Sequence, residues 1–192
     1  MAEKSKDQDV IQIKVSLKDS SPLIWRRVQV PATQPLRGLS RIIQACFSWK
    51  GLHLYVFEVE GEEYGDPEFD DGEMGWWNDQ NKRLFQIAKK TDTFTYTYDF
   101  GDNWVHEIKI EKFLNSEKGV KYPICIDGQE APPLDDVGGI HGHYEMLEAL
   151  NDPNHPEHEE YSDWVGEFYY RNKLDISFIN DIALERRRVL RK

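Results

Sequence analysis

The segment Phe94-Thr-Tyr-Thr-Tyr-Asp-Phe-Gly-Asp-Asn-Trp-Val-His-Glu-Ile-Lys-Ile110 carries the clearest pattern in the chain. Apolar and polar residues alternate along its two arms, which is the period of a half-buried β-strand. The arms lie on either side of Gly101-Asp102-Asn103, a sequence typical of a tight turn. The segment is therefore predicted to form a central β-hairpin on which other elements pack.

The register of this hairpin follows from the side chains that must share a face. A two-residue turn would place Glu107 opposite Tyr96 and bury a carboxylate among aromatic rings. A three-residue loop over 101–103 keeps every apolar side chain on one face, and Asn103 tolerates the left-handed backbone that such a loop needs. We therefore expect the cross-strand pairs Phe100–Trp104, Tyr98–His106, Tyr96–Ile108 and Phe94–Ile110.

The composition limits the classes of function. The 192 residues include 35 Asp and Glu against 24 Lys and Arg, a net charge of −11, which argues against direct nucleic-acid binding over most of the surface. No apolar run is long enough to span a membrane. The polar residues 1–9 are expected to form a flexible tail ahead of a single domain over 10–192. Cys46 and Cys125 do not have the spacing of a disulfide framework, which favours a reducing, cytoplasmic location.

The first half of the chain is expected to run strand, strand, helix, strand. Alternation over 11–17 and 23–31 predicts two strands joined as a hairpin. Apolar residues at helical spacing over 36–47 predict a helix that Thr33 caps and Gly51 ends. A third strand is expected over 53–59.

Arg26 occupies an apolar position in the second of these strands. It shares a face with Ile24, Val28 and Val30 in the alternating pattern. In one interpretation its stem covers apolar surface while its guanidinium reaches a carboxylate. In the other, the guanidinium binds an anion. The first is the simpler structural interpretation and is preferred.

The remaining segments complete an α+β fold with a mostly antiparallel sheet. Residues 60–80 are rich in Asp, Glu and Gly, so we expect a long surface loop there and solvated carboxylates in place of a cation site. Residues 121–126 predict another strand, whereas 128–139 contain too much Gly and Pro for a regular element. Helices are expected from about residue 143, with Asn154 capping one of them and a last helix over 178–189.

Polar residues that can carry chemistry gather near the hairpin turn, near His53 and in the loop 135–143. Glycines in these loops allow close backbone approach, so we expect the three segments to converge on one site. The candidate pocket residues are His53, Tyr98, Asp99, Phe100, Asp102, Trp104, His106, Asp135 and Asp136. Possible ligands of a divalent metal ion are Asp102, His106, Asp136, His141 and His143.

Each of these residues also has a structural interpretation. Asp99 and Asp102 suit a tight turn because their carboxylates accept hydrogen bonds from nearby backbone amides. His106 suits a buried position with a carbonyl partner. Asp135 and Asp136 can cap backbone amides, so the residue types alone do not separate a site from a scaffold.

The segment Thr95-Tyr-Thr-Tyr-Asp-Phe-Gly-Asp-Asn-Trp-Val-His106 resembles the signature of the plasmid pRiA4b ORF-3-like family, also known as the insertion-element passenger, TnpR-like family. Further segments match in the same order: Pro22-Leu-Ile-Trp-Arg-Arg-Val-Gln-Val-Pro31, Ile43-Gln-Ala followed by Trp49, His53-Leu-Tyr-Val-Phe57, Asp135-Asp-Val-Gly-Gly139, Gly142-His-Tyr144, Leu147 to His158, and Asn180. The resemblance covers Val10 to Leu184. It implies an α+β fold and an association with mobile elements, and it supplies no established reaction.

The chain departs from the family pattern at positions that matter for a metal site. It has His53-Leu54-Tyr55 where the family often has His-Leu-His, and Leu134-Asp135-Asp136 where Pro-Pro-Glu-Asp often precedes Val-Gly-Gly. The cysteine that often lies near those prolines has no counterpart here. Any metal site that needs all of those ligands would be incomplete in this chain.

Two functions of different classes fit these observations. The first is an intracellular, mobile-element-associated binding or accessory module that has no catalytic activity and acts through a protein partner. It agrees with the lack of a Gly-rich phosphate loop, a nucleophile elbow or a His-Glu-x-x-His motif. The alternative is a divalent-metal-dependent hydrolase that acts on phosphodiesters or nucleic acid.

Overall fold

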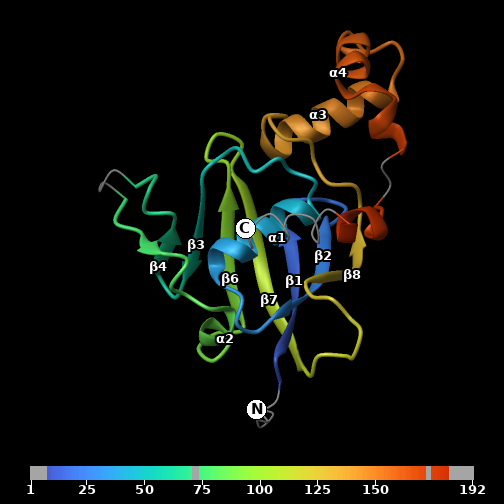
Figure 1. Cartoon of the computed structure of the whole chain (residues 1–192). Coiled ribbons are helices and arrows are strands. Elements are labelled where there is room, and N and C mark those ends of the chain that lie inside the picture. The colour runs from blue at the N-terminus through green and yellow to red at the C-terminus, as the bar shows by residue number, and fades with distance from the viewer. Residues whose placement is uncertain (1–7, 71–73, 172–173, 182–192) are drawn as a thin grey trace.

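The computed structural model describes residues 8–70, 74–171 and 174–181 (Figure 1). Eight strands form one sheet in the order β5-β4-β3-β6-β7-β1-β2-β8. Neighbouring strands are antiparallel, except for the parallel pair β4 and β5. The strands are β1 (Val10–Leu17), β2 (Trp25–Pro31), β3 (Tyr55–Val59), β4 (Glu62–Gly65), β5 (Trp77–Asn78), β6 (Thr93–Tyr98), β7 (Trp104–Leu114) and β8 (Ile124–Gln129). The predicted α+β class with a mostly antiparallel sheet is confirmed.

The helices lie over one face of this sheet and beyond both of its ends (Figure 1). They are α1 (Leu36–Cys46), α2 (Leu84–Ile87), α3 (Gly139–Asn151) and α4 (His158–Arg171), and residues 176–181 form a further short helix. Figure 1 shows α1 lying across the sheet, with α3 and α4 beyond the end where β6 stops. The apolar side of α1 is buried, and the Tyr96 hydroxyl bonds to Ser40 Oγ at 2.9 Å and accepts from Gln44 Nε2 at 3.2 Å. These bonds satisfy the polar atoms that the helix brings into the core.

The central hairpin is present, but its predicted register is wrong by two residues. Tyr98 pairs with Trp104 and Tyr96 with His106, so the loop spans five residues, 99–103. Asp99 and Asn103 both have positive φ, and the Asn103 amide donates to the Asp99 carbonyl at 2.6 Å. A shift of two residues leaves every side chain on its predicted face, so the alternating pattern could not detect the longer loop.

Residues 60–80 are not the irregular loop that we expected. Glu60 and Gly61, both with positive φ, form a two-residue turn between β3 and β4, and β5 then adds to the edge of β4. Gly65 makes this possible because a Cβ there would lie 2.3 Å from Cε3 of the Trp76 side chain. The sequence did not predict these strands because acidic residues, which are typical of solvated loops, occupy the exposed edge that they form. Asp71 lies outside the described residues.

The boundaries of α1 also differ from the prediction. Thr33 is not its cap: the N-cap is Pro35, and the Leu36 amide donates instead to the Lys82 carbonyl at 3.0 Å. The helix ends at Cys46, and Ser48 takes a positive φ that turns Trp49 back into the core. Burial of the Trp49 ring therefore ends the helix before Gly51 is reached.

The C-terminal elements begin earlier or later than the sequence indicated. α3 starts at Gly139, so His141 and His143 lie in a helix, and α4 starts at His158, beyond the proposed cap Asn154. Gly166 interrupts α4 with a non-helical conformation. Most of the predicted tail and most of the predicted helix over 178–189 lie outside the described residues. Within the described ranges, no helix is long and apolar enough to cross a membrane.

Candidate functional site

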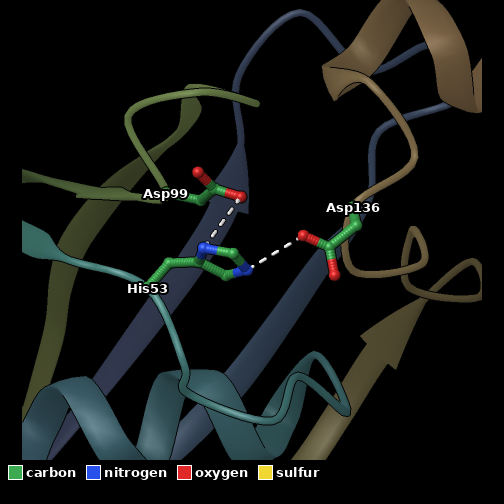
Figure 2. A group of neighbouring side chains, drawn as sticks. All are labelled: His53, Asp99 and Asp136. Atoms are coloured by element: carbon green, nitrogen blue, oxygen red, sulfur yellow. Dashed lines mark ion pairs between the residues drawn. The ribbon is translucent and has the colours of Figure 1, made fainter.

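Three segments that are distant in the sequence meet at the end of the sheet below α3. His53 lies just before β3, Asp99 begins the β6–β7 turn, and Asp136 lies between β8 and α3. His53 Nε2 is 3.0 Å from Asp136 Oδ1, and His53 Nδ1 is 3.7 Å from Asp99 Oδ2. Figure 2 shows the imidazole between the two carboxylates. We call these three residues the His53 cluster.

Asp99 is held by its own turn. Its Oδ1 accepts a hydrogen bond from the Gly101 amide at 3.0 Å, while its backbone amide donates to the Leu54 carbonyl at 2.9 Å. The second bond ties the turn to the segment that carries His53. Only one carboxylate oxygen is used by the turn, so Oδ2 remains directed at the imidazole.

The loop that carries Asp136 is fixed from two sides. The Asp135 carboxylate accepts from the Lys50 amide at 3.0 Å, and the Trp49 indole donates to the Pro133 carbonyl at 3.0 Å. On the other side, the Gly138 amide donates to Asp102 Oδ2 at 3.2 Å. A Cβ at Gly139 would lie 2.5 Å from the Asp102 carbonyl oxygen, so only glycine permits this approach. The predicted convergence of the three segments is observed.

The His53 cluster has the donor atoms of a cation site. One ligand atom from each residue lies within 4.8 Å of the other two. One imidazole nitrogen and two carboxylates suit Mn²⁺ or Zn²⁺. The same geometry also fits a purely structural arrangement, in which a protonated imidazole joins two carboxylates. Asp99 is almost fully buried, His53 is half-buried and the Asp136 side chain is 62% exposed, so the cluster opens to solvent on the Asp136 side.

An aromatic floor of four buried side chains, Trp49, Tyr98, Trp104 and His106, lies beneath the cluster. The Trp49 ring is centred 5.0 Å from Tyr98 and 5.6 Å from Trp104, and His106 meets it edge-on at 5.3 Å. Tyr98 in turn contacts His53 edge-on at 5.8 Å. Tyr98 and Trp104 therefore support the cluster from below and do not line an open pocket.

Burial determines the protonation state of the two titratable side chains in the aromatic floor, His106 and Tyr98. It lowers the pKa of His106 to about 4, and His106 Nδ1 lies 3.3 Å from the Tyr96 carbonyl, so the ring is neutral at pH 7. Burial, with the negative charge of Asp135 as a smaller cause, raises the pKa of Tyr98 to about 12. Neither group titrates between about pH 5 and 9, which suits a scaffold.

The remaining candidates lie apart from the cluster or have other partners. Phe100 is exposed and meets the edge of Trp76, while Asp102 binds the Gly138 amide. His141 is exposed and pairs with Glu145 at 3.1 Å. His143 is buried, which lowers its pKa to about 4. Of the five possible metal ligands, the structure brings only Asp136 into the His53 cluster.

A cleft of about 200 Å³ adjoins the cluster and shares His53 with it. Its walls include Arg37, Arg41, Trp76 and the exposed Phe69. Arg37 is paired with Asp66 at 2.5 Å and Asp79 at 2.9 Å, whereas Arg41 has no ion-pair partner within the described ranges. The sequence alone did not assign a functional role to Arg41, because a single charged residue on the polar side of a helix is common. It assigned none to Trp49, because Trp49 follows the predicted helix and belongs to no periodic pattern.

Comparisons with known proteins agree with the fold. The chain matches the model of the family described as plasmid pRiA4b ORF-3-like protein over residues 9–177. It is 36% identical over 167 residues to the uncharacterized protein y4hQ of Sinorhizobium fredii, a match that covers 84% of this chain and 83% of that protein. It is similar to the crystal structure of MM3350, a protein of unknown function from Methanosarcina mazei Go1, with a TM-score of 0.79 and 34% identity over 88% of this chain and 96% of that one. This chain therefore belongs to the plasmid pRiA4b ORF-3-like family.

Proposed function

We propose that this protein is a divalent-cation-dependent binding module. The observation that carries the proposal is the His53 cluster, in which three separate segments bring one imidazole and two carboxylates within 4.8 Å of one another. The module would act without catalysis as a cytoplasmic accessory of a mobile element, and it would bind a protein partner. The plasmid relationship of the family supports the mobile-element setting, and the net charge of −11 disfavours nucleic acid as the direct partner.

A cation explains the charge of the cluster better than a structural role alone. Asp99 is a nearly buried carboxylate whose Oδ2 has, among the described residues, only His53 Nδ1 opposite it, at 3.7 Å. A divalent ion would balance two carboxylates, and Asp99 would orient the imidazole that binds the ion through Nε2 beside Asp136. An ion held in this way joins the β6–β7 turn, the β8–α3 loop and the segment before β3, so its presence would fix the surface offered to a partner.

The test is calorimetric titration of the chelator-treated protein, prepared without an affinity tag, with Mn²⁺ and with Zn²⁺. We expect one ion per chain and at least about tenfold weaker binding for Asp136→Asn, because a direct ligand is lost. Asp19→Asn is the matched control, since Asp19 is also exposed with a positive φ and Asn tolerates that backbone. Absence of binding to the wild-type protein, or equal binding by Asp136→Asn, would overturn the proposal.

The second candidate is a metal-dependent hydrolase of phosphodiesters, favoured by the guanidinium of Arg41, which lines the cleft that contains His53 and has no ion-pair partner among the described residues. The ion would activate water, and Arg41 would hold an anionic oxygen of the substrate. Hydrolysis of bis-(p-nitrophenyl) phosphate with Mn²⁺ tests it, with Arg41→Gln expected to reduce the rate and Arg83→Gln as the control. Stoichiometric metal binding with no turnover above the metal alone would leave the binding module as the function.

A further inference from the structure

A second hollow, separate from the His53 cluster, lies between the segment that follows α1, the β8–α3 loop, α4 and the short C-terminal helix. Its volume is about 240 Å³. We call it the Arg26 cavity, after the residue at its base. Most of the residues that line it are apolar, and Trp164 and Phe178 are partly exposed. It is smaller than the pockets of roughly 300–1,000 Å³ that hold drug-sized ligands, so it suits a small molecule.

Arg26 is a fully buried cation without a carboxylate partner among the described residues. Its Nε donates to the Cys46 carbonyl at 3.0 Å, and its Nη1 donates to the Trp25 and Gln129 carbonyls at 2.8 and 2.9 Å. Its Nη2 is buried and has no hydrogen-bond partner in the part of the chain that the structure describes. The expectation that Arg26 lies on the buried face is confirmed, but its guanidinium bonds carbonyls where we expected a carboxylate.

The neighbouring Arg27 differs from Arg26 because its guanidinium has carboxylate partners. It points to the other face and pairs with Glu111 at 2.7 Å and Asp127 at 2.5 Å. A buried charge left without a counter-charge destabilises a fold by several kcal/mol. The Arg26 guanidinium lies over the Phe47 ring at 5.2 Å and Glu130 attracts it, but it has no salt-bridge partner among the described residues, so a ligand carboxylate would supply a direct counter-charge.

Asp135 supplies the complementary group. Its Oδ2 accepts from the Lys50 amide, while its Oδ1 is buried and has no hydrogen-bond partner within residues 8–70, 74–171 and 174–181. Lys50 and Asp175 also line the cavity, so two cations and two carboxylates surround it. Two residues that line the cavity thus carry a buried unpaired donor and a buried unpaired acceptor among the described residues.

The wall formed by the C-terminal segment is firmly attached. Asn180 Nδ2 donates to the Cys125 carbonyl at 3.0 Å, and Asn180 Oδ1 accepts from the Cys125 amide at 2.7 Å. Leu174 packs against Gly128, where a Cβ would lie 3.1 Å from its Cδ2. Asp175 caps the short helix by accepting from the Phe178 amide at 3.0 Å. The cavity is therefore preformed, which reduces the entropy lost on binding.

We propose that the Arg26 cavity binds a free amino acid with an apolar side chain. Its carboxylate would accept from Arg26 Nη2, its ammonium would donate to Asp135 Oδ1, and its side chain would lie against Trp164, Phe178 and Ile179. This site does not include the His53 cluster, so it neither requires nor supports the proposed cation binding.

The test is titration of the full chain with L-phenylalanine and L-leucine in the presence of EDTA, followed by calorimetry and thermal unfolding. 3-Phenylpropanoate, which lacks the ammonium, and phenethylamine, which lacks the carboxylate, are the matched probes. We expect the amino acids to bind and raise the Tm, and each matched probe to bind more than about tenfold more weakly, because each leaves one buried charge unpaired. Failure of both amino acids to bind, or equal binding by either matched probe, would overturn the proposal.

Variants locate the binding site. Asp135→Asn keeps an acceptor for the Lys50 amide but removes the charge, so it should weaken L-phenylalanine binding and leave 3-phenylpropanoate binding nearly unchanged. Trp164→Ala removes a half-exposed wall residue and should weaken every probe, whereas Trp77→Ala, exposed on the β5 edge, is the control. Arg26→Gln should abolish binding if the variant folds, and the other two variants decide the matter if it does not. Amino-acid binding unchanged in both Asp135→Asn and Trp164→Ala would place the ligand elsewhere and refute the assignment.

Discussion

The aromatic floor and the His53 cluster lie in direct contact, yet they are built in opposite ways. The floor uses rings that are almost completely buried, and its histidine is kept neutral. The cluster above it uses charged groups from three loops and opens to solvent through Asp136. Substitutions in the floor should therefore change stability, and substitutions in the cluster should change binding. This contrast can be tested residue by residue.

The largest expected effect belongs to Trp49. Its ring contacts Phe47, Tyr98, Trp104 and His106, and its indole donates to the Pro133 carbonyl. Trp49→Ala should lower the free energy of unfolding by about 3–5 kcal/mol, because a large cavity forms in the core. Urea unfolding measures this loss, and Trp77→Ala, with a ring that is 62% exposed, should lose much less. Similar losses of unfolding free energy in the two variants would show that the aromatic floor contributes no more to stability than an exposed ring.

The next effect is a dependence of stability on pH. Burial lowers the pKa of both His106 and His143 to about 4, whereas the unfolded value is near 6.5. The unfolded chain therefore binds more protons between these values, and stability is complete above about pH 6.5 and declines as the pH falls toward 4. Each imidazole should contribute a loss of about 2 kcal/mol between pH 7 and pH 5.

The measurement is urea unfolding at pH 7 and pH 5, repeated for His106→Asn. This variant should be less stable at pH 7 and should lose less stability on acidification than the wild-type protein. His141→Gln is the control, because His141 is exposed. A wild-type stability that does not fall over this window would show that the two buried imidazoles accept protons without cost.

Asp99 tests the boundary between the two regions. Asp99→Asn keeps an acceptor for the Gly101 amide but removes the charge next to His53 Nδ1. Metal affinity should fall about 10- to 100-fold, as for other residues that orient a ligand, with a change in unfolding free energy below about 1 kcal/mol. Calorimetry and urea unfolding on the same sample check both parts. A large loss of stability with unchanged metal affinity would assign Asp99 to the scaffold.

The smallest effect is expected for Phe100. The sequence assigned it to the apolar wall of the site, but the structure leaves it exposed in the turn, against the edge of Trp76. Phe100→Ala should change the unfolding free energy by only about 0.5 kcal/mol and leave metal binding intact. Tyr98→Ala, at the buried last residue of β6, is the comparison and should be much more destabilising. Equal effects would mean that the hairpin register is that of the original expectation.

The floor was more predictable from the sequence than the cluster. Alternation alone placed Tyr96, Tyr98, Trp104 and His106 on one buried face, because the side-chain period of a strand is two. It could not determine the loop length, because a register shift of two residues preserves that face. The turn depends on a positive φ at Asp99, and no local pattern announces that conformation in a residue other than glycine.

The convergence of the loops was predictable from their glycines, whereas the pairing of His53 with Asp99 and Asp136 was not. That pairing depends on the register of β3 against β6 and on the contact of Gly139 with the Asp102 backbone, both of which are tertiary. The roles of Trp49 and Arg41 could not be predicted for a related reason, because each side chain acquires its role only when a distant segment packs beside it.

The side chain of Asn180 has a consequence for how the sheet ends. β8 is an edge strand, and an open edge is a template on which another chain can add a strand. The carboxamide of Asn180 bonds both the amide and the carbonyl of Cys125, as a peptide group of a ninth strand would. One side chain thus occupies the backbone groups of Cys125 that an added strand would need, so a strand can pair with β8 at this residue only by displacing Asn180.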